Sequence, residues 1–141
     1  MKKDNVLYWI FTAPMVALML TASVPDILRN PQALEFLKHL GYPAYLLPFL
    51  GVAKLLGVLT VLAPGFPSLK QWAYAGLVFD LLGASYSHLS VGDPVSVWGF
   101  PVTCLALVAG SYIFYLKRMH HKQNGIAVER TAYRREILAQ K

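Results

Sequence analysis

Four apolar stretches dominate this sequence, and each is long enough to cross a membrane as a helix. They cover about residues 6–23, 44–63, 69–89 and 95–116, and the first and last contain no Asp, Glu, Lys or Arg. Because an α-helix rises about 1.5 Å per residue, some 20 residues span the hydrocarbon core of a bilayer, which is about 30 Å thick. The pattern predicts an all-α fold, an integral membrane four-helix bundle embedded in the lipid bilayer.

The composition excludes several other classes of protein. Apolar residues make up 56% of the 141 residues and charged residues only 14%, whereas soluble domains carry about 25% charged residues. Intrinsic disorder and a soluble enzyme with a large polar surface are therefore excluded, as is a two-domain architecture. The single cysteine, Cys104, excludes a disulfide framework and a cysteine-based zinc site.

Lys and Arg residues are distributed unevenly along the chain. Two precede the first stretch, Lys70 follows the turn between the second and third, and seven lie in residues 117–141. The other connections contain only Arg29 and Lys38. By the positive-inside rule both termini are cytoplasmic, with a membrane domain over residues 1–116 and a basic cytoplasmic tail over residues 117–141. This topology accounts for the net charge of +6, so we expect no nucleic-acid partner.

A cleaved signal peptide is the alternative interpretation of the first stretch. Lys2 and Lys3 precede it, and Thr21-Ala22-Ser23 is similar to a cleavage site. The stretch is longer than a usual signal-peptide core and three more follow, which favours a first membrane helix.

The connection over residues 24–43 contains the signals of a short helix. Asn30 is suited to cap it, Pro31 fits its first position, and Gly41 with Pro43 would end it. Apolar and charged residues fall on opposite faces: Leu34, Leu37 and Leu40 against Glu35 and Lys38. We expect an amphipathic helix in the first outer loop, lying on the membrane surface or over the mouth of the bundle.

Two charged residues interrupt the apolar stretches, Lys54 in the second and Asp80 in the third. A Lys near the bilayer centre costs about 2.5–3.5 kcal/mol, so it needs a partner. Counted from the intervening turn at Phe66, the two residues differ in depth by only about 3 Å on antiparallel neighbours. Small residues flank both positions and are expected to let the helices approach closely: Gly51, Gly57, Gly76 and Gly83.

Two interpretations of this predicted pair stay open. It is either an ion pair that locks two helices together, or a polar site that binds a head group or relays protons. A buried ion pair rarely adds stability over apolar packing, and ionisable groups inside a membrane are functional-site candidates by default.

A second group of polar residues is predicted at the outer face. Ser87 and His88 end the third stretch, Asp93 lies in the following turn, and we expect Asp26, Glu35 and His39 of the first outer loop to lie near them. No spacing typical of metal ligands occurs here, so no metal site is predicted. With Lys54 and Asp80, the residues Ser87, His88 and Asp93 are the candidates for ligand binding or proton relay.

Several short runs of the sequence resemble the DoxX-like family of small bacterial membrane proteins. They are Leu40-Gly41-Tyr42-Pro43, residues 51–57 (GVAKLLG), residues 69–76 (LKQWAYAG), Gly83-Ala84, Ser87-His88 and Gly92-Asp93-Pro94. The resemblance implies a four-helix protein of the bacterial inner membrane. It also suggests a link to redox systems, because the family takes its name from a subunit associated with a terminal quinol oxidase, and some relatives are linked to thiol or oxidative-stress systems. The absence of a cysteine pair weakens a thiol-redox role.

Three classes of function follow from these features. The first is an accessory protein of a respiratory or redox complex, with Lys54 and Asp80 contacting a quinone or a partner. The second is a binder or transporter of a small molecule or lipid that uses a cavity inside the bundle at the same two residues. The third, a self-sufficient enzyme, is least expected because no complete set of catalytic residues is visible. A homo-oligomer also stays open.

Overall fold

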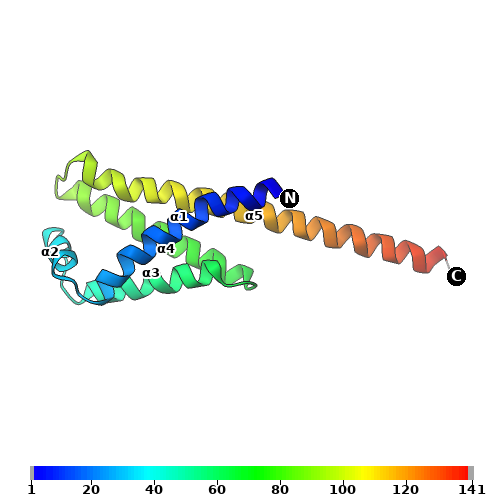
Figure 1. Ribbon diagram of the computed structural model, residues 1–141, viewed down its shortest axis with the longest axis horizontal. Coiled ribbons are helices and arrows are strands. Elements are labelled where there is room, and N and C mark those ends of the chain that lie inside the picture. Colours follow the sequence, from blue (N-terminus) through cyan, green and yellow to red (C-terminus); the bar gives the residue numbers. More distant parts are fainter. Residues whose placement is uncertain (1, 140–141) are drawn as a thin grey trace.

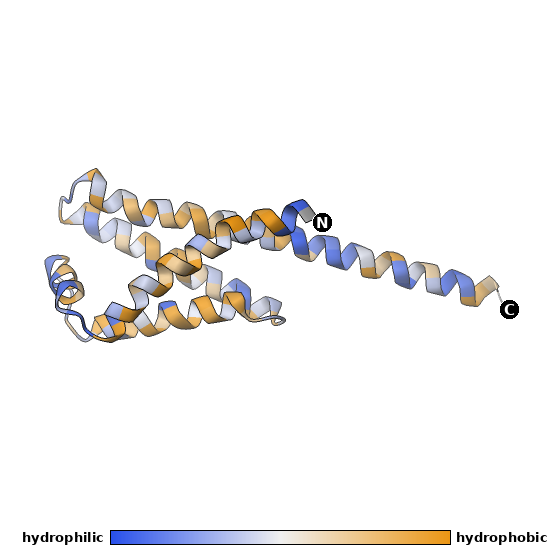
Figure 2. Ribbon diagram, in the orientation of Figure 1, coloured by the Kyte–Doolittle hydropathy of each residue, from blue (hydrophilic) through white to orange (hydrophobic). Residues whose placement is uncertain are grey.

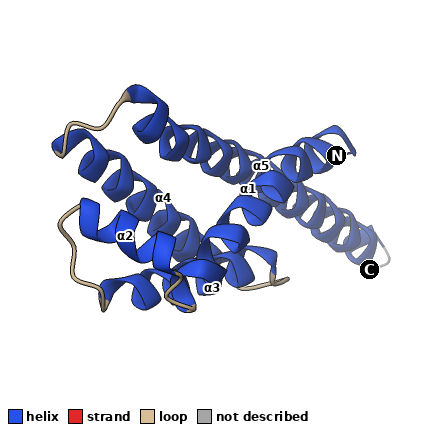
Figure 3. Ribbon diagram, turned by 60° about the vertical axis from the view of Figure 1, so that its left-hand side comes forward, coloured by secondary structure: helices blue, strands red, loops and turns tan. Residues whose placement is uncertain are grey.

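The computed structural model describes residues 2–139, which form five α-helices and, within that range, no strand (Figures 1 and 3). The helices are α1 (Lys2–Ile27), α2 (Pro31–His39), α3 (Leu46–Leu62), α4 (Pro67–Ser90) and α5 (Val95–Ala139). The predicted all-α class is therefore confirmed. Gln140 and Lys141, the last two residues of the predicted tail, lie outside the described residues.

The four long helices are arranged so that each packs against two others. Helices α1 and α4 both contact α3 and α5, and they lie on opposite corners of the bundle. The N-terminus, the α3–α4 turn and the far part of α5 lie toward one end of the molecule, which we call the inner end (Figure 1). Helix α2 and the α4–α5 loop lie at the opposite, outer end (Figure 1).

The predicted spans correspond to α1, α3, α4 and α5. By length and composition, two of the described helices are long and apolar enough to cross a membrane: α1, from Lys3, and α5. Helix α3 is apolar but has only 17 residues. Many large apolar side chains of the bundle point outward, among them Phe49, Trp72 and Phe79, which are 67%, 79% and 74% exposed. Figure 2 shows that these helices are largely apolar, while polar residues concentrate in the far part of α5.

Two helices extend further than the apolar stretches predict. Helix α1 continues past Ser23 to Ile27, and it includes Pro14 and Pro25. Helix α5 does not stop near Leu116 but continues to Ala139, so the described part of the basic tail is a helix. Hydropathy marks where a segment stops being apolar, whereas helix formation depends on propensity; residues 117–139 contain no proline to end the helix.

The buried core lies mainly in the inner part of the bundle. Met15, Val58, Val61 and Val108 are at most 1% exposed and pack with several tyrosines. A chain of hydroxyl groups crosses this core, because Ser111 Oγ lies 2.6 Å from Thr12 Oγ1 and 2.7 Å from Tyr74 Oη. The sequence analysis missed this link between α1, α4 and α5.

The flanking glycines divide into two kinds, which corrects one expectation. A Cβ at Gly51 would lie 2.8 Å from Asp26 Cβ and 2.9 Å from the backbone nitrogen of Ile27, so α1 and α3 touch here. A Cβ at Gly57 would lie 3.3 Å from the Leu77 side chain. At Gly76 and Gly83 a Cβ would meet nothing within 4 Å. The expected close approach is wrong at these last two positions, where the glycines leave open space instead.

Helix α2 forms where the capping signals predict it. The Asn30 side chain accepts a hydrogen bond of 3.0 Å from the backbone N–H of Gln32, and Pro31 begins the helix. The chain turns away at Gly41, whose φ of +81° is a left-handed conformation that suits glycine. The helix lies across the outer end of the bundle (Figure 3).

Candidate functional site: a polar triad in the wall of an apolar cavity

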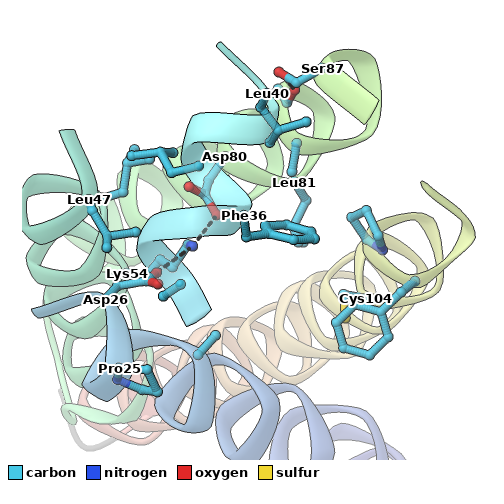
Figure 4. Close-up of a pocket in the computed structure, with 18 of the residues that line it drawn as sticks. Pro25, Asp26, Phe36, Leu40, Leu47, Lys54, Asp80, Leu81, Ser87 and Cys104 are labelled. Carbon is cyan, nitrogen blue, oxygen red and sulfur yellow. Dashed lines mark hydrogen bonds and ion pairs between the residues drawn. The ribbon is translucent and has the colours of Figure 1, made fainter. Parts of the chain in front are cut away.

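The outer half of the bundle contains a partly open cavity of about 740 Å³, to which all five helices contribute residues. Its lining is mostly apolar and includes Pro25, Phe36, Leu40, Leu47, Leu81 and Cys104 (Figure 4). Helix α2 covers part of it with Phe36 and Leu37, and the residue that caps the helix, Leu40, also lines it. A cavity of this size, with a few polar groups on an apolar wall, is typical of small-molecule sites.

Lys54 lies between two carboxylates in the wall of this cavity (Figure 4). Its Nζ is 3.1 Å from Asp26 Oδ2, to which it donates a hydrogen bond, and 3.7 Å from Asp80 Oδ2. The three side chains are 18%, 14% and 18% exposed for Lys54, Asp26 and Asp80. We call these residues the triad.

The triad differs from the sequence-based expectation in one member. The structure brings Lys54 and Asp80 together, as their similar depth predicts. Asp26, however, was expected in the outer-face group, and that placement is wrong. It belongs to the last turn of α1, which packs on α3 at Gly51, and its carboxylate therefore points at Lys54.

Asp26 could have been found from the sequence by one signal. It is the first acidic residue after Asp4 and comes three residues, less than one helical turn, beyond the first apolar stretch. A longer first helix would have placed it inside the bundle.

The charges within the triad do not balance. Two carboxylates share one ammonium group, which leaves one negative charge when both acids are ionised. Asp26 is also in the last turn of α1, where the partial negative charges of the free carbonyl groups disfavour a carboxylate. Lys54 is therefore the group on which both acids depend, and the triad retains capacity for a proton or for a hydrogen-bond donor of a ligand.

A second cluster joins α2 to the α4–α5 loop at the outer end. The Asp93 carboxylate accepts hydrogen bonds from His88 Nδ1 at 2.6 Å and from His39 Nε2 at 2.8 Å. The bond from His88, and then the bond from His39, hold the pKa of Asp93 below its ordinary value. The His88 side chain is only 3% exposed and lines the cavity. Glu35, which was expected near His88 and Asp93, takes no part in these hydrogen bonds.

Ser87 and the Phe36 ring also attach α2 and the residues that follow it to α4. Ser87 Oγ donates to the carbonyl of Gly83 at 2.7 Å and accepts from Tyr42 Oη at 2.8 Å. The Phe36 ring packs against the His88 ring with centroids 4.8 Å apart. Ser87, His88 and Asp93, which were predicted at the outer face, therefore hold α2 and Tyr42 against α4 at the outer end of the cavity. Within residues 2–139, no group of three His, Cys, Asp or Glu side chains is arranged to hold a metal ion.

Comparison with known protein families identifies a family for most of the chain. The sequence model of the DoxX-like family matches residues 10–111, a stretch that contains the triad, His88, Asp93 and all of the residues that line the cavity. The far part of α5 lies outside this match. No curated protein and no solved structure matches the chain.

Proposed function

Because the chain belongs to the DoxX-like family, we propose that it is a four-span protein of the bacterial inner membrane whose cavity binds a quinone-like molecule for a membrane redox or respiratory complex. The observation that carries the proposal is the position of Lys54, which lies between two carboxylates in the wall of a largely apolar cavity of about 740 Å³.

The exposed surface of the bundle supports a membrane location. Contiguous apolar surface of more than a few hundred Å² is rare on soluble monomers, yet large apolar side chains are exposed on α1, α3, α4 and α5 alike. These side chains would contact lipid, and the interior would then hold the polar groups.

The chemistry of the triad suits a quinone head group in both oxidation states. The Lys54 ammonium has three N–H donors, of which Asp26 accepts one, so it can donate another to a quinone carbonyl. The carboxylate of Asp80 can accept a hydrogen bond from a quinol hydroxyl. The apolar remainder of the cavity matches an uncharged ring.

Within the redox complex, we assign this chain a binding role rather than independent catalysis. The electron-transfer groups would be supplied by the partner, and the cavity would hold or exchange the quinone near it.

Mass spectrometry tests this function most directly. Protein purified in a mild detergent should carry a bound quinone, identified after gentle ejection and by extraction of the same sample. Gly83→Trp should lower the occupancy several-fold, because Gly83 lines the cavity and a Cβ at this position would meet no atom within 4 Å. Gly99→Trp is the matched control, since Gly99 is also open to within 4 Å. Equal occupancy in both variants, or an absence of quinone, would count against the proposal.

A second candidate function, lipid or small-molecule binding without a redox role, uses the same cavity. It is favoured by the apolar lining, to which phospholipid chains are equally suited. Recovery of a phospholipid in place of a quinone from the same experiment would select it.

A further inference from the structure

A second, smaller groove adjoins the cavity on the far side of the triad. It has a volume of about 250 Å³ and lies between α3 and α4. Small residues form much of its lining, from Ala53, Gly57 and Thr60 on α3 and from Ala73 and Gly76 on α4. Large apolar side chains border it, and Leu56, Leu69 and Trp72 are 59%, 55% and 79% exposed.

Lys54 and Asp80 line both the groove and the cavity. Their ion pair therefore stands at the boundary between the bundle interior and the outward surface of α3 and α4. From Asp80 the groove extends along α4 as far as Trp72 and Leu69. Eight residues of helix separate Asp80 from Trp72, which is about 12 Å in the direction of the α3–α4 turn.

The Lys54–Asp80 contact is the weaker of the two contacts that Lys54 makes. It measures 3.7 Å, beyond hydrogen-bonding distance, whereas Lys54 donates to Asp26 at 3.1 Å. Lys54 can therefore separate from Asp80 and keep Asp26 as its partner. Opening the boundary leaves the ammonium group paired with Asp26, and the Asp80 carboxylate then accepts a hydrogen bond from the head group of the ligand in place of its contact with Lys54.

We propose that the occupant of the cavity is an amphiphile with a long apolar chain, whose head group lies at the triad and whose chain passes between Lys54 and Asp80 into the α3–α4 groove. This inference rests on the proposed binding function and narrows its ligand class to lipid-soluble, long-chain molecules. The continuity of groove and cavity at two shared charged residues supports this occupant. So does the apolar border of the groove, which leads a chain along the helices toward surrounding lipid.

Chain length separates this inference from the proposed function. The probes are two benzoquinones with the same head group, one with a single isoprene unit and one with a decyl chain. Their dissociation constants are measured by native mass spectrometry on detergent-solubilised full-length protein. Gly76→Trp is expected to fill the groove, since Gly76 lines it and a Cβ at this position would meet nothing within 4 Å. Gly83→Trp fills the cavity, and Gly99→Trp is the control.

The inference predicts a different pattern for each variant. Gly76→Trp should weaken binding of the decyl compound about tenfold or more, because roughly two displaced methylene groups account for a factor of ten, and should leave the short compound unchanged. Gly83→Trp should weaken both. If Gly76→Trp unfolds the protein, as judged by thermal melting, Thr60→Trp blocks the groove from the α3 side and should give the same result.

Two outcomes would overturn the inference, and they differ from failure of the proposed function. If Gly83→Trp weakens both compounds but Gly76→Trp weakens neither, the cavity binds quinone and the groove plays no part. If Gly76→Trp weakens both compounds equally, the groove does not hold the chain. If the unaltered protein binds neither compound, the proposed function fails and this inference fails with it.

Discussion

Lys54 is the only cation in contact with the two carboxylates of the triad within residues 2–139. Substitutions in the triad should therefore lower the free energy of unfolding by different amounts, according to the charge that each leaves. Lys54→Met leaves two half-buried acids without a partner and should cost up to about 3–5 kcal/mol, the loss typical of a buried pair. Asp26→Asn or Asp80→Asn removes the excess negative charge and should cost less, roughly 1–2 kcal/mol. Thermal or denaturant unfolding in one detergent would rank the three variants. Equal losses for Lys54→Met and Asp80→Asn would show that Lys54 does not neutralise both acids.

The third member of the triad also changes what a compensating substitution requires. If only Lys54 and Asp80 were paired, Lys54→Met with Asp80→Leu would restore stability. Because Asp26 would then be left alone at 14% exposure, that double variant should remain destabilised, and further replacement by Asp26→Asn should recover much of the folded yield. Quinone binding should stay lost in the triple variant if the triad is a site rather than a structural clamp.

The stability of α2, which covers part of the cavity, is expected to depend on pH through Asp93. Folding lowers its pKa through the hydrogen bonds from His88 and His39, so this contribution to stability is present above the ordinary pKa of an Asp, about 3.9. It is lost as the pH falls from there through the lowered value. The protection of α2 amides from hydrogen exchange, corrected for the intrinsic exchange rate at each pH, should therefore decrease in acid. Asp93→Asn should show low protection already at neutral pH and little further change in acid, while Glu35→Gln should behave like the unaltered protein. Unchanged exchange in Asp93→Asn would mean that α2 is held by other contacts.

At the scale of helices, the glycines decide where pairs of helices meet. Gly51→Ala should destabilise the fold by about 1–3 kcal/mol, because the added methyl group would press on Asp26 and on the Ile27 backbone. Gly76→Ala should be neutral or stabilising by up to about 1 kcal/mol, because it adds helix propensity in open space. Melting temperatures measured side by side check the contrast. Similar effects at both positions would contradict the helix contact described for Gly51.

Helix positions could be predicted from the sequence better than helix partners could. Hydropathy located four of the helices to within a few residues at most ends, and capping signals located α2, because both depend on local sequence. The contact of Asp26 with Lys54 depends on how α1 packs against α3, and the hydroxyl chain through Ser111 depends on how α1 and α4 pack against α5. Such pairings join residues 28 and 99 positions apart, and no periodicity in one sequence specifies them. A cavity inside the bundle was expected, but the residues that line it could not be predicted, for the same reason.

For the whole molecule, the distribution of basic residues argues for one orientation in the membrane. The N-terminus and the α3–α4 turn lie toward the end of the bundle from which the basic part of α5 extends, while α2 and the α4–α5 loop lie at the opposite end (Figure 1). Ten of the 13 Lys and Arg residues belong to the first group of segments and only Arg29 and Lys38 to the second, with Lys54 between them. By the positive-inside rule, we therefore propose that the basic end is cytoplasmic.

Reporter fusions test this orientation without reference to any ligand. A reporter after Lys70 or at the C-terminus should give a cytoplasmic signal, and one near Glu35 or Asp93 should give an outer signal. The fusions at Lys70 and Asp93 are the informative pair, because α4 separates them and lies outside the two helices that by length and composition alone are suited to span a membrane. If both report the same side, α4 does not cross the bilayer. The triad would then lie near the membrane surface, where water could reach Lys54 and Asp80, and the groove between α3 and α4 would no longer face lipid. Opposite signals at these two sites, with a cytoplasmic C-terminus, would place the triad inside a four-span bundle.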